Sequence, residues 1–105
     1  MEVKFKIKKL KQDWQNVSVE DKGSVYNTNL ISVLELKGMI ELAECIVEGA
    51  ITREESRGAH TRLDFPKRLD DNWLKHLLFY FTSEGPRIDN LPVTVTNWKP
   101  QERTY

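Results

Sequence analysis

The apolar positions of the chain recur with two different periods, which divide it into helical and extended parts. Near the N-terminus, apolar residues at 3, 7, 10, 14 and 17 follow helical spacing and predict a helix from about Val3 to Gln15. Residues 3, 5 and 7 also alternate with lysines, as they would in a strand, but that pattern is shorter. Residues 16–26 show no periodicity and contain a turn signal at 21–24, which indicates a loop.

A second and longer helix is predicted from about Asn29 to Glu55, where a polar stripe lies opposite a broad apolar face. Asn27, Thr28 or Asn29 can cap its first turn with a side-chain oxygen. The first half of this helix is apolar around much of its circumference, so we expect it to be the more buried half. A glycine at position 38 indicates a bend or a close approach of another helix, and Gly58 is expected to end the helix in a left-handed conformation.

An extended strip and a hairpin are predicted for the rest of the chain. Pro66 disfavours a helical residue before it, so we expect residues 59–66 to be extended. Asp70 or Asp71 could cap a helical turn that carries Trp73. The aromatic run at 75–82 and the segment 87–95 flank a turn at 83–86, which predicts a β-hairpin that packs on the helices, followed by a docked, irregular tail.

The predicted fold class is therefore mainly α. We expect a small helical domain of two main helices, with an extended charged strip and a C-terminal β-hairpin. At 105 residues the chain is long enough for one small domain. We predict a single domain over residues 1–105, in which residues 1–57 form the helical part and residues 58–105 form the strip, the hairpin and the tail.

Composition and charge exclude several classes of protein. The chain has 16 basic and 16 acidic side chains and no formal net charge, which argues against a dedicated nucleic-acid binder. Its apolar runs are too short to span a bilayer. Its one cysteine offers neither an internal disulfide nor a zinc set. The five glycines are isolated and form no dinucleotide-binding fingerprint, so we expect no cofactor site within this chain. The two histidines and the scattered carboxylates show no metal-ligand spacing, so we expect no metal site.

The densest charge lies between residues 53 and 76, where six basic residues and both histidines are interspersed with Leu63, Phe65 and Trp73. Such a cluster could recognise a carboxylate or phosphate group, or it could form a fixed internal ion-pair network. His60 lies between two arginines and could act as a general base or as a hydrogen-bonded structural residue. His76 follows Trp73 and lies on an apolar segment, which favours a structural role.

This charged region also carries a resemblance to a known family. Residues 55–66 read ESRGAHTRLDFP and residues 70–76 read DDNWLKH. Both blocks resemble the C-terminal domain of the succinate dehydrogenase and fumarate reductase flavoprotein subunits. The resemblance extends through residues 19–23 and 27–30 to the ending at 102–105, and covers roughly residues 16–105. The first block is also typical of L-aspartate oxidase, a sister flavoenzyme, whereas the second block and the tail favour the dehydrogenase.

The resemblance implies a part of an enzyme that interconverts succinate and fumarate by hydride transfer with FAD. The catalytic and FAD-binding residues would belong to the flavin-binding and capping domains, so this chain would be an inactive C-terminal fragment by itself. An iron–sulfur subunit and a membrane anchor would be its further partners, and the complex would lie in the cytoplasm on the inner face of the membrane. Arg103 and Tyr105 match family residues that support covalent flavin attachment.

We hypothesise that the charged strip docks this domain on the flavin domain. The candidate docking residues are Arg57, His60, Arg62, Asp64, Trp73 and His76, with Phe65 as a further apolar contact. Two other readings of the whole chain stay open at this point. It could be the C-terminal domain of L-aspartate oxidase, or a free-standing module that binds another protein without catalysis.

Overall fold

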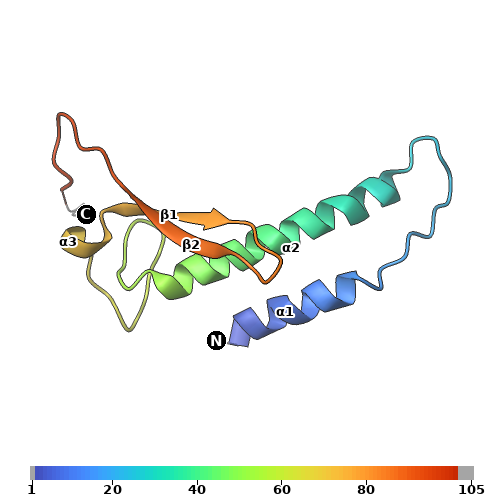
Figure 1. Ribbon diagram of the computed structural model, residues 1–105, viewed down its shortest axis with the longest axis horizontal. Coiled ribbons are helices and arrows are strands. Elements are labelled where there is room, and N and C mark those ends of the chain that lie inside the picture. The colour runs from blue at the N-terminus through green and yellow to red at the C-terminus, as the bar shows by residue number, and fades with distance from the viewer. Residues whose placement is uncertain (1, 102–105) are drawn as a thin grey trace. The chain divides into compact units, whose positions relative to one another are not determined.

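The computed structural model describes residues 2–101, so the predictions for Arg103 and Tyr105 lie outside the described residues (Figure 1). The chain divides into two compact units, Met1–Arg53 and Glu54–Tyr105. The helices α1 and α2 lie in the first unit, and α3 lies with the strands β1 and β2 in the second. The predicted fold class is confirmed: two main helices precede a C-terminal antiparallel hairpin. The predicted single domain stays a prediction.

The first unit is a pair of helices that run side by side in opposite directions (Figure 1). Helix α1 covers Glu2–Trp14 and α2 covers Thr28–Thr52, so both predicted helices are confirmed. Asn27 is the N-cap of α2, and its side-chain oxygen accepts a hydrogen bond from the amide of Leu30 at 2.9 Å. This bond satisfies one of the amides that the first turn of a helix leaves without an internal partner.

A small apolar core and a set of polar contacts hold α1 and α2 together. Ile7 of α1 and Ile40 of α2 are the buried apolar side chains among the described residues. Around them, two lysines of α1 form salt bridges with glutamates of α2, and the Trp14 indole NH donates to the Val33 carbonyl at 3.2 Å. The lysine–glutamate pairs are Lys4 with Glu48, at 2.5 Å, and Lys11 with Glu44.

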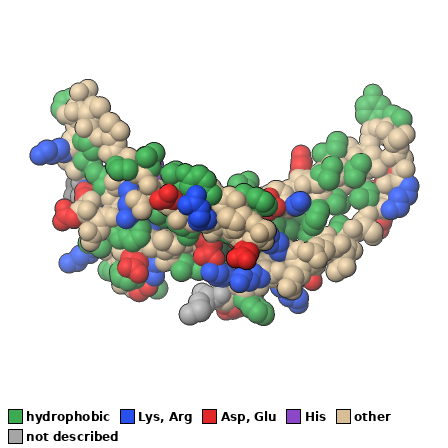
Figure 2. Space-filling view, in the orientation of Figure 1, with side chains coloured by type: hydrophobic (Ala, Val, Ile, Leu, Met, Phe, Trp, Pro, Cys, Tyr) green, Lys and Arg blue, Asp and Glu red, His purple; other side chains and the backbone are tan. Residues whose placement is uncertain are grey.

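Two expectations for α2 were wrong. The helix ends at Thr52, because Arg53 adopts an extended conformation with φ −76° and ψ 106°. The first half of the helix is also not the more buried half: Leu30, Ile31 and Leu34 are exposed. Helix α1 has 13 residues and α2 has 25, so α1 can cover only one side and part of the length of α2. Apolar side chains on the other sides of α2 remain at the surface of the unit (Figure 2).

Gly38 lies within α2 without interrupting it, and a Cβ atom at this position would meet no other atom within 4 Å. The structure therefore shows no close approach of another helix there within the described chain. We predict that Gly38→Ala raises the free energy of unfolding of the first unit by about 1 kcal/mol, because alanine favours a helix interior over glycine. Urea unfolding followed by circular dichroism measures this change.

In contrast, Gly58→Ala should destabilise the chain, because Gly58 has φ +58°, a backbone conformation that alanine rarely adopts.

The second unit is built around a hairpin and a preceding loop. Strand β1 (Lys75–Tyr80) pairs antiparallel with β2 (Arg87–Pro92), from Lys75 opposite Pro92 to Tyr80 opposite Arg87. The Arg87 guanidinium lies 4.4 Å from the centre of the Tyr80 ring and closes the loop end of the hairpin. The predicted hairpin is confirmed, whereas its packing on the helices stays a prediction. Strand β2 ends at Pro92 rather than at residue 95, because proline lacks the amide that a ladder requires.

Helix α3 is a single turn, Asp70–Trp73, and the predicted capping by an aspartate was wrong. Leu69 is the N-cap residue, and it makes no side-chain cap hydrogen bond. The Asp70 carboxylate accepts hydrogen bonds from two arginines instead.

The predicted end of α2 at Gly58 was also wrong. Gly58 lies with Ala59 in a tight turn, where Arg57 and His60 exchange two backbone hydrogen bonds, of 2.8 and 3.0 Å. The predicted extended strip is thus a turn followed by irregular chain.

Candidate functional site

The most deeply buried side chain of the described second unit is a carboxylate, Glu55, which has no exposed surface. Its two oxygens accept hydrogen bonds from the Arg57 guanidinium, at 2.7 Å from Nε and 3.1 Å from Nη2. The oxygen Oε2 also accepts from the Leu69 amide at 2.8 Å. A buried carboxylate is stable only when it is paired and hydrogen-bonded, and Glu55 meets both conditions. It therefore ties the start of the loop to the start of α3.

Two arginines extend this network to Asp70. Arg57 Nη2 donates to Asp70 Oδ1 at 2.5 Å, and Arg68 Nη2 donates to Asp70 Oδ2 at 2.9 Å. Arg68 also donates through Nη1 to the Gln101 carbonyl at 2.9 Å, which attaches the last described residue to the network. We call Glu55, Arg57, Arg68 and Asp70 the carboxylate–arginine network. Hydrogen bonds between ionised groups are the stronger class, so this network is a main determinant of the loop's conformation.

Ser56 fixes the middle of the same loop. Its hydroxyl donates to the Phe65 carbonyl at 2.8 Å and accepts from the Arg62 amide at 2.9 Å, while its own amide donates to the Lys67 carbonyl at 3.1 Å. Hydrogen bonds from a serine hydroxyl to nearby backbone groups are a common substitute for regular secondary structure. Here they hold residues 62–67 beside residue 56 without a helix or a strand.

The candidate docking residues do not form one cluster. Arg57 belongs to the carboxylate–arginine network, whereas Arg62 pairs with Asp64 at the surface, with hydrogen bonds of 2.9 and 2.5 Å. Arg62 also lies 4.7 Å from the centre of the Phe65 ring. His60 is half-buried and is held through its backbone by Arg57. The remaining two candidates lie further along the chain: Trp73, at the end of α3, has the Lys75 ammonium 4.7 Å from its ring, and His76 is exposed on β1.

The sequence-based candidates missed Glu55, Ser56, Arg68 and Asp70. Glu55 and Ser56 stand at the start of the first recognisable block, but Glu55 was assigned to the polar end of a helix. An acidic residue two positions before an arginine is too common a pattern to predict burial. The burial follows from the end of α2 at Thr52, which turns the Glu55 side chain into the second unit.

Ionisation of Asp70 couples this network to pH. Hydrogen bonds from the Arg57 guanidinium, together with the nearby charge of Arg68, hold the pKa of the Asp70 carboxyl below its ordinary value of 3.8. The pKa of the Arg57 guanidinium is raised, mainly by its hydrogen bonds to Glu55. A carboxyl with a depressed pKa stabilises the fold fully above pH 3.8, and this contribution is lost as the pH falls through its folded pKa.

We therefore expect the second unit to lose stability below about pH 3.8 in part through Asp70. The Asp70→Asn variant should show a smaller loss of stability over this acid range than the unmodified chain. Urea unfolding at several pH values between 2 and 5 measures the change. Asp71→Asn is the matched control, because Asp71 is exposed and adjacent. If the two variants share one pH profile, Asp70 does not contribute to the acid dependence.

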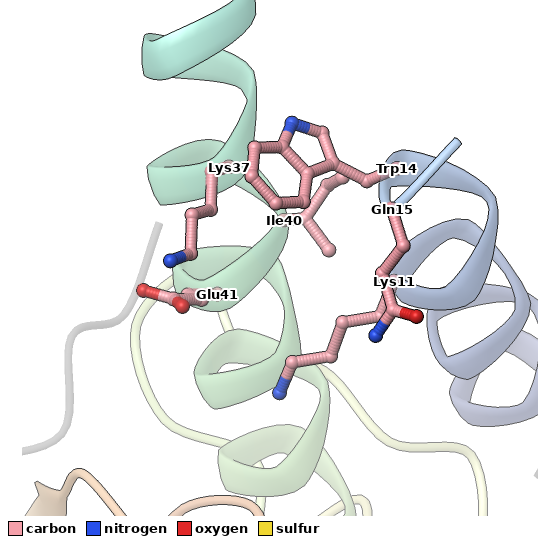
Figure 3. Close-up of a pocket in the computed structure, with 6 residues that line it drawn as sticks. All are labelled: Lys11, Trp14, Gln15, Lys37, Ile40 and Glu41. Carbon is pink, nitrogen blue, oxygen red and sulfur yellow. The ribbon is translucent and has the colours of Figure 1, made fainter. Parts of the chain in front are cut away.

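The first unit contains a cavity of about 200 Å³ between α1 and α2 (Figure 3). In Figure 3 the Trp14 indole lies beside Ile40 and the Lys37 side chain. The Lys37 ammonium is 5.4 Å from the centre of that ring. The cavity is smaller than typical sites for drug-sized ligands, and no glycine-rich loop borders it. The described residues also contain no cluster of acids, histidines or cysteine suited to a metal ion. The small volume of this cavity and the lack of a glycine-rich loop beside it do not fit an FAD site there.

Comparison with known proteins identifies the class to which this domain belongs. The chain matches a Mycobacterium tuberculosis fumarate reductase flavoprotein subunit with 45% identity over 100 residues, which is 94% of this chain and 17% of that protein. It matches a Rickettsia conorii succinate dehydrogenase flavoprotein subunit with 36% identity over 91 residues, 86% of this chain and 15% of the relative. In a solved structure of an E. coli quinol fumarate reductase variant, 18% of the matched chain aligns with 96% of this one, at a TM-score of 0.90 and 36% identity.

The model of one protein family, described as the fumarate reductase flavoprotein C-terminal domain, matches residues 2–105. The chain belongs to this family, which confirms the resemblance found in the sequence. It spans about a sixth of the length of the curated relatives it matches. Among the described residues, no helix has the length and apolar character needed to cross a membrane.

Proposed function

We propose that this chain is the structural C-terminal domain of a subunit that interconverts succinate and fumarate by hydride transfer with FAD. The observation that carries the proposal is the family match over residues 2–105, together with relatives named for both fumarate reductase and succinate dehydrogenase. The cavity between α1 and α2 does not fit an FAD site, which supports placing the flavin and the catalytic residues in the rest of the subunit. The role of this chain is then to fold, to dock on the flavin domain and to support assembly.

The distribution of polar and apolar groups supports a docking role. The carboxylate–arginine network satisfies its charges within the second unit, which leaves Arg57 suited to holding the loop in shape rather than to binding a substrate. Leu63 is 97% exposed at the surface of that loop, between the half-buried Arg62 and the exposed Asp64 with which Arg62 pairs. An exposed leucine beside a charged pair suits contact with another protein surface. We infer that this part of the loop contacts the flavin domain and that Arg57 acts by positioning it.

The proposal extends to the partners of the complete subunit. One matched structure is described as a quinol-fumarate reductase with menaquinol molecules. By analogy, the complete subunit would transfer electrons to an iron–sulfur subunit on a membrane anchor, at the cytoplasmic face of the membrane. This chain would take part as the C-terminal portion of the flavoprotein.

A chimeric subunit tests the proposed function. The matching segment of the M. tuberculosis fumarate reductase flavoprotein is replaced by this chain, and bound flavin and dye-coupled turnover are measured with succinate, fumarate and L-aspartate. We expect retained flavin and turnover of succinate or fumarate. Deleting the segment without replacement should abolish both. A replaced subunit that behaves like the deleted one would contradict the proposal, and turnover of aspartate alone would assign the domain to L-aspartate oxidase instead.

A further inference from the structure

Helix α2 has a second apolar stripe that faces away from α1. Ile31, Leu34, Gly38 and Leu42 follow one another at spacings of three, four and four residues, which places them on one face of a helix. We call these four residues the α2 stripe. Successive residues of a helix are about 100° apart, so Gly38 and Leu42, two positions either side of the buried Ile40, lie on the side opposite to it. The stripe therefore cannot be part of the contact with α1.

The α2 stripe is exposed throughout its length. Ile31, Leu34 and Leu42 have 55%, 61% and 66% of their surfaces accessible. A Cβ atom added at Gly38 would meet nothing within 4 Å, so nothing in the described chain requires a glycine in the middle of this helix. A glycine in a helix interior costs stability relative to alanine. A requirement for close approach by another backbone would explain a glycine that the chain itself does not need.

The size and chemistry of the stripe define what could cover it. Its four residues are uncharged, the charged Glu35 lies on the same face of the helix, four residues after Ile31, and the stripe spans 12 residues, or roughly 16 Å along the helix axis. Packed helices lie about 8–10 Å apart, and a glycine at the contact permits the shorter distances. The curated relatives are about six times as long as this chain, so most of the subunit lies outside it. That remaining part is available to supply an apolar helix.

We propose that the α2 stripe is the docking surface for a helix from the part of the flavoprotein subunit outside this chain, and that Gly38 sets the close approach. This inference rests on the proposed function, since it takes the remainder of the flavoprotein as the partner. It adds to that function the surface of α2 that the partner helix contacts and the residue that limits the distance between the two helices. It also accounts for the exposed first half of α2, which was expected to be buried.

Leucine substitutions distinguish this surface from the rest of α2. Gly38→Leu adds a side chain within the stripe, and Ser32→Leu adds the same side chain at an exposed position about 120° away around the helix. In the free chain neither substitution should lower the melting temperature. In the chimeric subunit Gly38→Leu should lower the melting temperature measured by circular dichroism and should accelerate flavin release roughly tenfold, because the partner helix is forced away. Ser32→Leu should leave both values unchanged.

The outcomes separate this inference from the proposed function. If the unsubstituted chimera holds flavin and turns over its substrate while Gly38→Leu melts like Ser32→Leu, the docking surface is wrong and the function stands. If the unsubstituted chimera binds no flavin, the proposed function fails. The docking surface is then still tested by the difference in melting temperature between the Gly38→Leu and Ser32→Leu chimeras. Sedimentation of the free chain tests a second copy as the occupant. A dimer that Gly38→Leu disrupts, with no change in the chimera, would overturn the inference.

Discussion

Replacing Glu55 with alanine is expected to lower the free energy of unfolding of the second unit by about 3–5 kcal/mol. Glu55 is fully buried, and its carboxylate accepts from both the Arg57 guanidinium and the Leu69 amide. Alanine would leave a guanidinium and an amide without this acceptor in a place that water reaches poorly. A loss of this size is a large part of the stability of a small domain, so the second unit should become largely disordered.

Amide hydrogen exchange measures this effect where it should be greatest. The Leu69 amide and the Ser56 amide should exchange much faster in the Glu55→Ala variant, because both depend on the conformation of the loop. Glu54→Ala is the matched control, since Glu54 is the exposed neighbour of Glu55. Equal exchange rates in the two variants would show that the buried carboxylate does not hold the loop. In the first unit, α1 and α2 should be unaffected by either substitution.

The second large effect is expected in the first unit, where Ile40→Ala should cost about 2–5 kcal/mol. Ile40 is one of the two buried apolar side chains among the described residues, and it lies between α1 and α2. Removing its side chain takes away a large share of a small core and leaves a cavity beside Trp14. Denaturant unfolding of the chain, followed by the fluorescence of Trp14 and the other tryptophans, measures the loss.

Leu42→Ala provides the matched comparison for Ile40→Ala. Leu42 lies on the same helix but is exposed, so its replacement should change the stability of the free chain by less than about 0.5 kcal/mol. In the chimeric subunit the same substitution should become destabilising, because Leu42 belongs to the α2 stripe. Comparable losses for Ile40→Ala and Leu42→Ala in the free chain would place the core on the wrong face of α2.

The periodicity of the sequence was sufficient to predict the elements but not their surroundings. The helices, the Asn27 cap and the hairpin follow from local patterns, and the structure confirms them. The burial of α2 could not be predicted in the same way. An apolar residue such as Leu34 indicates that something covers it, but the pattern does not say whether that partner lies within the chain. Within the described first unit, α1 covers one face of α2.

The charged loop shows a different limit of sequence-based prediction. Its density of charge was compatible with an internal ion-pair network, and the structure shows that Arg57 pairs with Glu55 and Asp70, while its predicted docking role stays a prediction. The partners of Arg57 were not identified, because Glu55 and Asp70 meet it only after the chain has turned at Gly58 and returned at residue 70. Contacts that depend on the path of an irregular loop leave no periodic signal. The recognisable blocks at 55–66 and 70–76 identify this loop as a distinct segment, but they do not show which of its side chains pair with one another.

Arg57→Ala in the chimeric subunit distinguishes a structural and docking role of this chain in the flavoprotein from a role in catalysis. The measurement compares flavin content, melting temperature and the Michaelis constant for succinate with those of the unsubstituted chimera. We predict a lower melting temperature and less bound flavin, with an unchanged Michaelis constant for the molecules that retain flavin. Normal stability and flavin content with a raised Michaelis constant would rule out a purely structural role and would assign Arg57 to substrate binding.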